Sequence, residues 1–458
     1  MARFVRSSKY RHVFTPPQKT EEWFNGVRVS KTAWEGSDYV AASTSKFAMC
    51  WGTAGGGAVA VVNFSDKGKL PEGDKMPIIN GHKNPVLDLA WNPFNESLLA
   101  TASEDGYSKI WKIADEGLTE SLTADDAVQS LKGHRRKVGT VAWHPTANNV
   151  LATSSQDYTV KLWDIEKGEA KVTLDGPKDL IHATQWNRDG SLLAITGKDK
   201  QIRFGDPRTA NFEASWQGHD GVKGARVLFL NDGKIFSTGF DRQSSRQYRV
   251  WDPRGDTSKP LVSVNLDVSS GVLMPKYDYD TSILFIAGRG DGNIRFFEYT
   301  GEDKLIYPLS EHKGVPYKGG AWVPKTGCNV SENEIARFLG LCEPKNAVIP
   351  VPFIVPRKSD LFQDDIFPET ADGVGEPSLT LAEYFDGKNA DPKTVSLENG
   401  FVRKERPAEE PKFEKKEEEE LTPAQLKAAY EKAQNRITYL EAELQKRELL
   451  LKEANISF

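Results

Sequence analysis

Short runs of β-branched and other apolar residues recur through the first 350 positions of the chain, separated by Asn, Asp and Gly. Residues 141–143, 150–153 and 160–163 are three such runs within one stretch. Runs of this length that end at turn residues are typical of β-strands. The pattern therefore predicts an all-β fold made of many short strands.

A Gly-His pair followed at fixed distances by Asp and Trp is the strongest internal repeat. Gly81-His82 is followed by Asp105 and Trp111, with 23 residues from His to Asp and 6 from Asp to Trp. A second copy with the same spacing comprises Gly133, His134, Asp157 and Trp163. Weaker copies continue as far as Phe297, at a mean step of about 46 residues, close to the period of a WD repeat.

This period predicts a seven-bladed WD-repeat β-propeller within residues 1–350, with four strands in each blade. One step back from Trp111 reaches the apolar run 59–64, and one step beyond Phe297 reaches position 343. A ring of blades needs its last sheet completed, commonly by a strand from the other terminus. Residues 9–14 alternate basic or polar with aromatic side chains, so we expect them to supply that strand.

The repeated polar residues predict a buried chain of hydrogen bonds in each of two blades. The expected members are His82, Ser103, Asp105 and Trp111 in one blade and His134, Ser155, Asp157 and Trp163 in the next. Each link in such a chain contributes roughly 1 kcal/mol of stability, and an unpaired partner costs more. A metal or acid–base site is the alternative. We assign a structural role because these residues recur blade by blade instead of converging on one point.

Residues 351–402 are punctuated by Pro and Gly and nevertheless keep bulky apolar side chains. These are Phe353, Ile354, Leu361, Phe362, Ile366, Phe367, Tyr384, Phe385 and Phe401. Apolar anchors along an extended path predict a C-terminal extension that packs as a strap on the outer surface of the propeller. A partly ordered linker is the alternative.

Residues 403–420 hold 6 basic and 8 acidic residues, and Phe413 is their only large apolar side chain. Such a segment cannot bury enough apolar surface to form a core. The composition predicts a disordered charged linker between the propeller and the C-terminal segment.

The pattern of residues 421–458 predicts a helix that oligomerises as a coiled coil. Thr422 and Pro423 suit the N-cap and first position of a helix, and apolar residues then follow a heptad spacing. The residues expected at the helix interface are Tyr430, Arg436, Ile437, Leu440, Glu441 and Leu444. Arg436 and Glu441 fit a pattern associated with short parallel trimers, so a homotrimer is favoured. A dimer remains an alternative because Ala433 and Arg447 interrupt the seam, and a single amphipathic helix docked elsewhere is another alternative.

Composition and charge narrow the classes of function. The net charge of −5 and pI near 5.9 argue against a nucleic-acid-binding protein. Residues 1–31 hold seven Lys or Arg against two acids, so this end of the chain can meet an acidic surface. Three unpatterned cysteines favour a reducing compartment, and no run of apolar residues is long enough to span a membrane or act as a secretion signal. We therefore expect a cytoplasmic protein that contacts membranes only peripherally, if at all.

Catalysis finds no support in the sequence. There is no Ser-His-Asp motif context, no clustered set of metal ligands and no phosphate loop, since no Lys-Ser/Thr follows residues 55–57. We expect a non-enzymatic protein without a cofactor or metal.

Several segments resemble one family. Residues 6–14, 81–88, 133–140 and 293–298 look like the corresponding parts of coronins, and residues 356–370, Pro-Arg-Lys-Ser-Asp-Leu-Phe-Gln-Asp-Asp-Ile-Phe-Pro-Glu-Thr, are a specific family signature. The resemblance extends from residue 3 to about residue 402. It implies binding to F-actin, oligomerisation through a terminal coiled coil, and influence on the branch-nucleating actin-related-protein complex and on cofilin-driven disassembly. It also implies a place in the actin cytoskeleton at the cell cortex.

The resemblance further implies a role for Arg28, because an Arg in the segment that reads 27–30 here is implicated in filament contact in coronins. Lys31, Lys9 and Arg11 are additional basic candidates, for which simple solvation on the rim is the alternative. Two other functions remain open for a WD-repeat protein. One is a scaffold for trafficking or signalling complexes that never touches actin. The other is a peripheral protein that binds phosphoinositides through its basic N-terminus.

Overall fold

The structure is a computed structural model of the 458-residue chain. It describes residues 6–302, 305–359, 361–373, 375–398, 400 and 413–414, together with positions 427, 434, 438 and 442. Residues 1–415 form one compact unit and residues 416–458 a second, and the fold below is that of the first unit.

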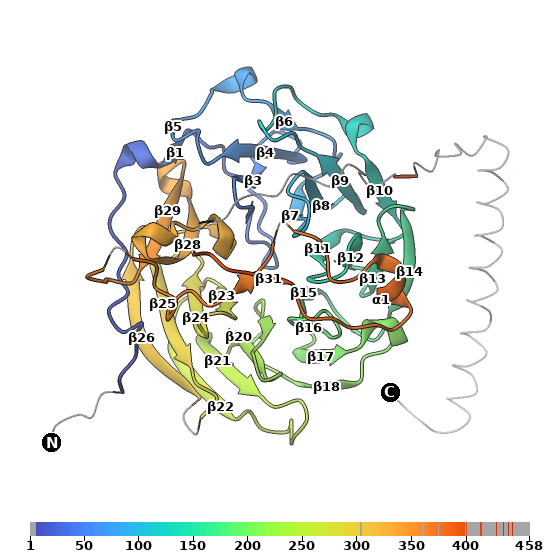
Figure 1. Ribbon diagram of the computed structural model, residues 1–458. Helices are drawn as coiled ribbons and strands as arrows, with labels where there is room; N and C mark the ends of the chain where they lie inside the picture. The colour runs from blue at the N-terminus through green and yellow to red at the C-terminus, as the bar shows by residue number, and fades with distance from the viewer. Residues whose placement is uncertain are drawn as a thin grey trace. The chain divides into compact units, whose positions relative to one another are not determined.

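In the described residues, seven sheets, antiparallel except for one parallel pair of strands in the seventh, stand in a ring around a central channel (Figure 1). We number these sheets as blades 1 to 7 in chain order, each with its innermost strand first. Blade 1 comprises β2 (Val40–Ala42), β3 (Lys46–Trp51), β4 (Ala58–Asn63) and β6 (Ile78–Ile79). Blade 2 comprises β7 (Val86–Trp91), β8 (Leu98–Ser103), β9 (Tyr107–Lys112) and β10 (Gln129–Lys132). Blade 3 comprises β11 (Val138–Trp143), β12 (Val150–Ser155), β13 (Val160–Asp164) and β14 (Glu169–Leu174).

The remaining blades repeat this order. Blade 4 comprises β15 (Ile181–Trp186), β16 (Leu193–Gly197), β17 (Gln201–Gly205) and β18 (Ala214–Gln217). Blade 5 comprises β19 (Arg226–Phe229), β20 (Ile235–Phe240), β21 (Ser245–Trp251) and β22 (Val262–Val268). Blade 6 comprises β23 (Leu273–Asp278), β24 (Ile283–Gly288), β25 (Asn293–Tyr299) and β26 (Ile306–Lys313). The all-β propeller and its seven blades are as the repeat period predicted.

Blade 7 joins the two ends of the propeller chain. Its strands are β27 (Gly319–Trp322), β28 (Glu334–Cys342), β29 (Ala347–Ile354), β1 (Phe24–Asn25) and β5 (Gly68–Lys69). β1 pairs antiparallel with β29, placing Phe24 opposite Val348, and Phe14 forms a single bridge with Ile354. The expectation that residues 9–14 form the closing strand is therefore wrong except at Phe14, since residues 9–12 form turns and the strand lies ten residues later. β29 also carries the propeller four residues past the expected boundary at 350.

The two flat ends of the ring are distinguished by the direction of the innermost strands. We call the end at which β7, β11 and β15 begin the start face, and the end at which they finish the end face. At the end face, Trp91, Trp143 and Trp186 each donate a hydrogen bond from Nε1 to a carbonyl of the preceding blade, at 2.9–3.1 Å. These contacts join each of blades 2, 3 and 4 to the blade before it.

A buried polar chain runs through blade 2, with one member that differs from the expectation. Trp111 Nε1 donates to Thr101 Oγ1 at 2.9 Å, Thr101 Oγ1 lies 2.7 Å from His82 Nε2, and His82 Nδ1 lies 2.9 Å from Asp105 Oδ2. Ser103 is not in this chain. Its hydroxyl donates to Asn84 O at 2.9 Å and accepts from Asp105 N.

The same arrangement recurs in blade 3, in which Thr153 lies between Trp163 and His134, and His134 contacts Asp157. Ser155 instead donates to a backbone carbonyl. Thr lies four residues before Asp, in the middle of the strand. Because side chains alternate along a strand, Thr, the Trp of the paired strand and the Ser two positions later share one face of the sheet. Ser lies at the strand end, so it braces the turn and does not reach the imidazole.

Close packing against the Trp explains why Gly precedes His in the repeat. A Cβ at Gly81 would lie 2.2 Å from Cη2 of Trp111, closer than any real contact.

Blade 5 keeps the buried polar chain with other residues: Trp251 Nε1 and His219 Nε2 both contact Ser237 Oγ at 2.9 Å, and Gln247 replaces the Asp.

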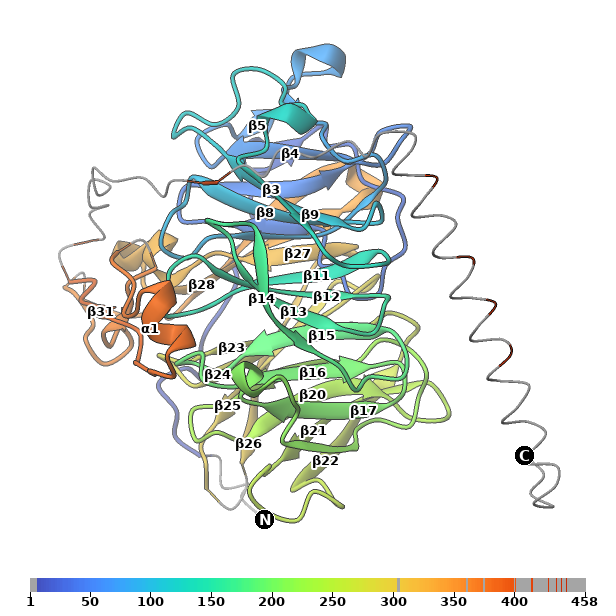
Figure 2. The same cartoon turned by 90° about the vertical axis from the view of Figure 1, so that its right-hand side faces the viewer.

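The C-terminal strap, residues 355–398, crosses the end face (Figures 1 and 2). It contains β30 (Thr370–Ala371) paired with β31 (Thr394–Val395), and α1 (Leu381–Phe385). Leu379 bridges to Ala147 of blade 3, and Thr370 donates to Asp280 Oδ2 of blade 6 at 2.6 Å. The strap thus spans blades on both sides of the channel, across a flat end of the ring and not around its outer wall.

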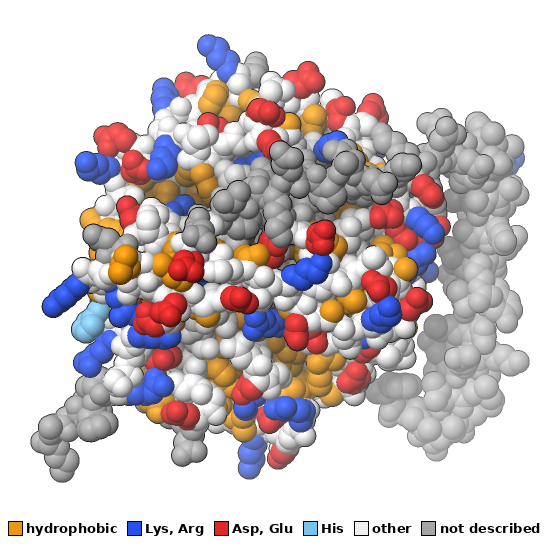
Figure 3. Space-filling view, viewed as in Figure 1, with side chains coloured by type: hydrophobic (Ala, Val, Ile, Leu, Met, Phe, Trp, Pro, Cys, Tyr) orange, Lys and Arg blue, Asp and Glu red, His pale blue; other side chains and the backbone are white. Residues whose placement is uncertain are grey.

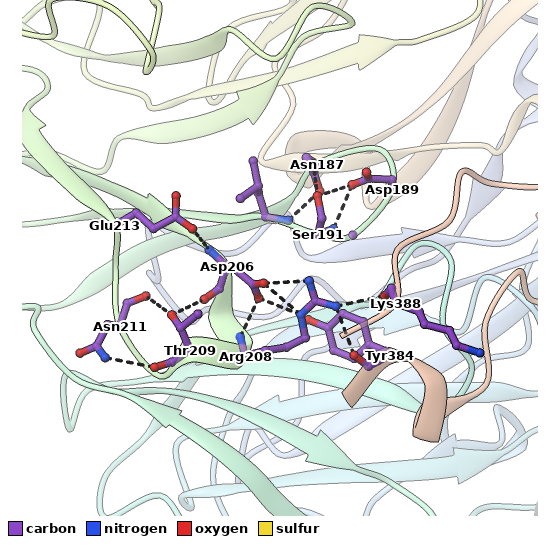
Figure 4. Close-up of polar contacts among 12 residues, drawn as sticks. Asn187, Asp189, Ser191, Asp206, Arg208, Thr209, Asn211, Glu213, Tyr384 and Lys388 are labelled. Atoms are coloured by element: carbon purple, nitrogen blue, oxygen red, sulfur yellow. Dashed lines mark hydrogen bonds and ion pairs between the residues drawn. The ribbon is translucent and has the colours of Figure 1, made fainter. Parts of the chain in front are cut away.

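Arg208 of blade 4 holds the end of α1 (Figure 4). Its guanidinium donates to Tyr384 O at 3.2 Å and Lys388 O at 3.0 Å and is oriented by Asp206. The Tyr384 ring packs 4.3 Å from the imidazole of His144, whose pKa burial lowers to about 3. A neutral His144 accepts at Nδ1 from the amide of Ala147, which fixes the loop that the strap pairs with.

The predicted tail falls mostly outside the described residues. The charged linker 403–420 is described only at Phe413 and Glu414. In the predicted coiled coil 421–458, the described residues Lys427, Gln434, Thr438 and Ala442 have helical backbone. The six expected interface residues, Tyr430, Arg436, Ile437, Leu440, Glu441 and Leu444, lie outside the described residues.

The polar chain of blade 2 leads to a stability prediction. Thr101→Val keeps the side-chain shape but leaves Trp111 Nε1 and His82 Nε2 without a partner inside the blade. We expect the free energy of unfolding to fall by roughly 2–4 kcal/mol, since each orphaned buried group costs about 1–3 kcal/mol. Thr101→Ser retains the hydroxyl and serves as the control in thermal and urea unfolding. Equal stability of the two variants would contradict the assigned role of this hydroxyl.

Candidate functional site

The segment that carries Arg28 and Lys31 crosses the start face between blade 7 and blade 1. Its first half is held by backbone contacts: Val29 bridges to Trp51 at the end of β3, and Gly52 N donates to Arg28 O at 2.8 Å. The Arg28 and Lys31 side chains are exposed. The backbone is thus fixed while both cations face solvent.

The second half of this segment, residues 34–38, closes the start end of the central channel. Trp34 Nε1 donates to Gly139 O of blade 3 at 2.9 Å. Arg226 of blade 5 donates to Glu35 O at 2.9 Å and to Asp38 Oδ1 at 3.0 Å. Arg289, in the loop between β24 and β25 of blade 6, donates to Trp34 O at 3.1 Å. We call residues 34–38 the plug.

A partly open cavity of about 680 Å³ lies in the middle of the ring, between the plug and the strap. Its lining includes Gly36 and Asp38 from the plug and Thr370 and Asp372 from the strap. Burial raises the pKa of Asp88 in its wall to about 7, although Val141 N donates to the carboxylate. Within the described residues, no cluster of three or more His, Cys, Asp or Glu side chains is arranged to hold a metal ion.

Burial also determines the charge state beside the plug. It lowers the pKa of His182, whose ring lies 5.9 Å from that of Trp34, to about 4, despite Glu35 nearby. It also lowers the pKa of the Arg289 guanidinium. The neutral imidazole therefore packs against the indole as an aromatic surface, and backbone carbonyls of the plug compensate for the buried guanidinium charges.

The start face carries basic side chains on consecutive loops beyond the N-terminal segment. Together with Arg28 and Lys31 we call this set the basic arc: Lys83 entering blade 2, Arg135 and Arg136 entering blade 3, and Lys178 entering blade 4. All six are exposed, and none has an ion-pair partner among the described residues.

The acidic residues of the same loops mostly point inward. Burial alone would raise the pKa of Asp157, but hydrogen bonds from His134 and from the amide of Arg135 outweigh it and hold that pKa far below its usual range. Asp105 is held in the same way by His82, and Glu104 pairs with Lys137 at 2.6 Å. Because these carboxylates serve internal contacts, the outer surface of the arc is left predominantly positive.

The basic N-terminus predicted from the sequence does not form one patch. Lys9 donates to Asp365 O of the strap, and the turn that holds Lys9 and Arg11 leads into the bridge between Phe14 and Ile354 at the end face. Arg28 and Lys31 lie at the start face, at the opposite end of blade 7. Figure 3, which views the end face, shows acidic and basic side chains intermixed there.

Sequence analysis missed four members of the basic arc. Lys83, Arg135, Arg136 and Lys178 follow or replace the Gly-His position of successive blades. A repeat aligns equivalent loops on one face of a propeller, so basic residues at the same place in each repeat were a signal that could have revealed the arc.

In the described residues, no helix is both long and apolar enough to cross a membrane.

Comparisons with known proteins agree with the repeat and the fold. Family models match residues 73–112 and 126–164 as a WD domain, G-beta repeat, residues 348–392 as a type of WD40 repeat, and residues 3–69 as a domain of unknown function (DUF1899). Coronin-A of Dictyostelium discoideum is 45% identical over 99% of this chain and 99% of its own length. Human Coronin-2A is 41% identical over 86% of this chain and 75% of its own length. A crystal structure of the WD40 domain of Toxoplasma gondii coronin superposes with a TM-score of 0.78, at 30% identity, covering 84% of this chain and 97% of that one.

The plug leads to a prediction about the segment that presents Arg28. Arg226→Met removes the contacts to the Glu35 carbonyl and the Asp38 carboxylate while keeping an apolar stem. We expect hydrogen–deuterium exchange of residues 34–39 to speed up about tenfold or more, whereas the amides of β16 in blade 4 keep their protection. Unchanged exchange in residues 34–39 would show that the plug is held by packing alone.

Proposed function

Because this chain belongs to the coronin family and so has an actin-associated function, we propose that it binds actin filaments laterally through its start face. Arg28 and Lys31 are the proposed leading contacts, on a segment fixed at both ends. The filament surface is acidic, and a guanidinium pairs with carboxylates through two parallel hydrogen bonds, which suits Arg28 to this role.

The observation that carries this proposal is the basic arc. Opposite charge on the two surfaces raises the rate of encounter and selects the orientation in which the start face meets the filament. Lys9 and Arg11, the other basic candidates, belong to the end face, and contact through the start face leaves them outside the interface.

The predicted helix 421–458 would make the grip multivalent. Several propellers that each bind weakly, joined through one coiled coil, hold one or two filaments better than a single propeller. Once the first propeller is bound, the others contact the filament at high effective concentration. We propose a homotrimer, with a dimer as the alternative, and cross-linking or bundling of filaments as the result. Modulation of branched nucleation and of cofilin-driven disassembly, at the cell cortex, belongs to the same proposal.

Reversing one charge on each face tests whether the start face is the surface that binds actin. Arg28→Glu should weaken cosedimentation with actin filaments by about tenfold or more at low salt, because it removes one cation and places a carboxylate against an acidic surface. Arg11→Glu changes the net charge equally on the end face and should leave binding within about twofold of the unmodified protein.

If both variants bind alike, the start face is not the contact. If the unmodified, folded protein stays in the supernatant, it is a scaffold without direct actin binding. Flotation with phosphoinositide-containing liposomes tests the third function, and protein that floats with liposomes but does not pellet with filaments would favour it.

Deletion of residues 421–458 tests multivalency. We expect the shortened protein to lose bundling, measured by low-speed pelleting of filaments, and to show weaker high-speed cosedimentation while its thermal midpoint stays unchanged. Bundling by a monomeric, shortened protein would contradict the role assigned to the helix.

A further inference from the structure

Phe413 and Glu414, about fifteen residues after the end of the strap, lie against the rim of the propeller between blades 2 and 3. Phe413 is the only large apolar residue of the segment 403–420. Its half-buried side chain packs on the apolar cluster that contains Trp143, Trp163 and Ile165. An aromatic residue in an otherwise charged segment thus meets an apolar surface.

The backbone of Glu414 is bound on both sides. Glu414 N donates to Glu166 O at 2.8 Å, and Gln129 Nε2 donates to Glu414 O at 3.1 Å. The Glu414 side chain is exposed. Recognition at this position therefore uses the main chain, and it does not depend on which side chain residue 414 carries.

The receiving groups are held in place by the propeller itself. Gln129 is buried, with 4% of its surface exposed, and its amide is also within hydrogen-bond distance of Ile165 O and Glu166 O. Asn149 donates to the Glu166 carboxylate and fixes the turn that offers the Glu166 carbonyl. A donor, an acceptor and an apolar surface are thus oriented together for one extended segment.

We propose that this rim is a peptide-docking site for an aromatic residue followed by one extended backbone unit, and that its occupant is residues 413–414 of this chain. Docking divides the linker between the strap and the predicted helix. Residues 401–421 can span at most roughly 70 Å when fully extended, whereas residues 415–421 can span only roughly 25 Å. The site therefore sets how far the C-terminal helix can stand from its propeller.

Protection from trypsin tests docking on the full chain without any actin. Trypsin cleaves after Lys412 and Lys415, on either side of the docked pair. The rate of cleavage at each site is compared with the rate for a synthetic peptide of residues 403–420 that carries the same substitution, and the ratio is the protection.

We expect at least tenfold protection at Lys412 in the unmodified protein. Phe413→Ala removes the apolar anchor, and Glu414→Pro removes the amide that donates to Glu166 O, so each should lower the protection at least fivefold. Glu414→Ala is the matched control, because it keeps both backbone contacts and should keep the protection. Cleavage of the unmodified protein as fast as the peptide, or equal protection in Phe413→Ala and Glu414→Ala, would overturn the docking site.

The consequence for filament cross-linking rests on the proposed function and has a separate measurement. Phe413→Ala should widen the spacing between bundled filaments in electron micrographs, since the tether of each head lengthens. An unchanged spacing with lost protection would overturn the spacing role while the docking site stands. Absence of bundling by any variant would contradict the proposed function and leave the trypsin result unaffected.

Discussion

Closure of the ring by the N-terminal segment is the constraint on which the rest of the structure depends. Blade 7 is built from three strands within residues 319–354 together with β1, residues 24–25, and β5, residues 68–69. This pairing links chain segments more than 300 residues apart and removes the open edges that a linear stack of sheets would expose. The chain that leaves β1 must then cross the start face to begin blade 1, and this path carries Arg28, Lys31 and the plug.

The same closure gives the two faces of the propeller different characters. At the start face, one short segment is clamped by Arg226 and Arg289 over the mouth of the channel. At the end face, the strap crosses from blade 6 to blade 3 and is anchored by Arg208. Chain from outside the repeats crosses both ends of the channel and partly covers the cavity in its centre.

The internal polar chains explain why an overall acidic protein has a basic face. Asp105 and Asp157 lie on the start-face loops, but each serves a buried histidine. The neighbouring cations have no such internal partner, and Lys83, Arg135 and Arg136 therefore face solvent. An internal requirement of the WD repeat thus shapes the external charge, and net charge alone was a poor guide to the sign of any one face.

The sequence by itself determined the features that recur at a fixed period. The spacing of His82, Asp105 and Trp111 and its copies predicted seven blades, because a repeat with constant spacing imposes the same local hydrogen bonds in each unit. It could not choose Thr101 over Ser103, since both are hydroxyl residues on the same face of β8 and only their positions along the strand decide which one reaches the imidazole. Only the tertiary structure decided that Lys9 and Arg11 lie apart from Arg28, that the closing strand lies at Phe24, and that Phe413 meets Gln129. Each of these depends on contacts between segments far apart in the chain, which the local pattern of apolar and polar residues does not encode.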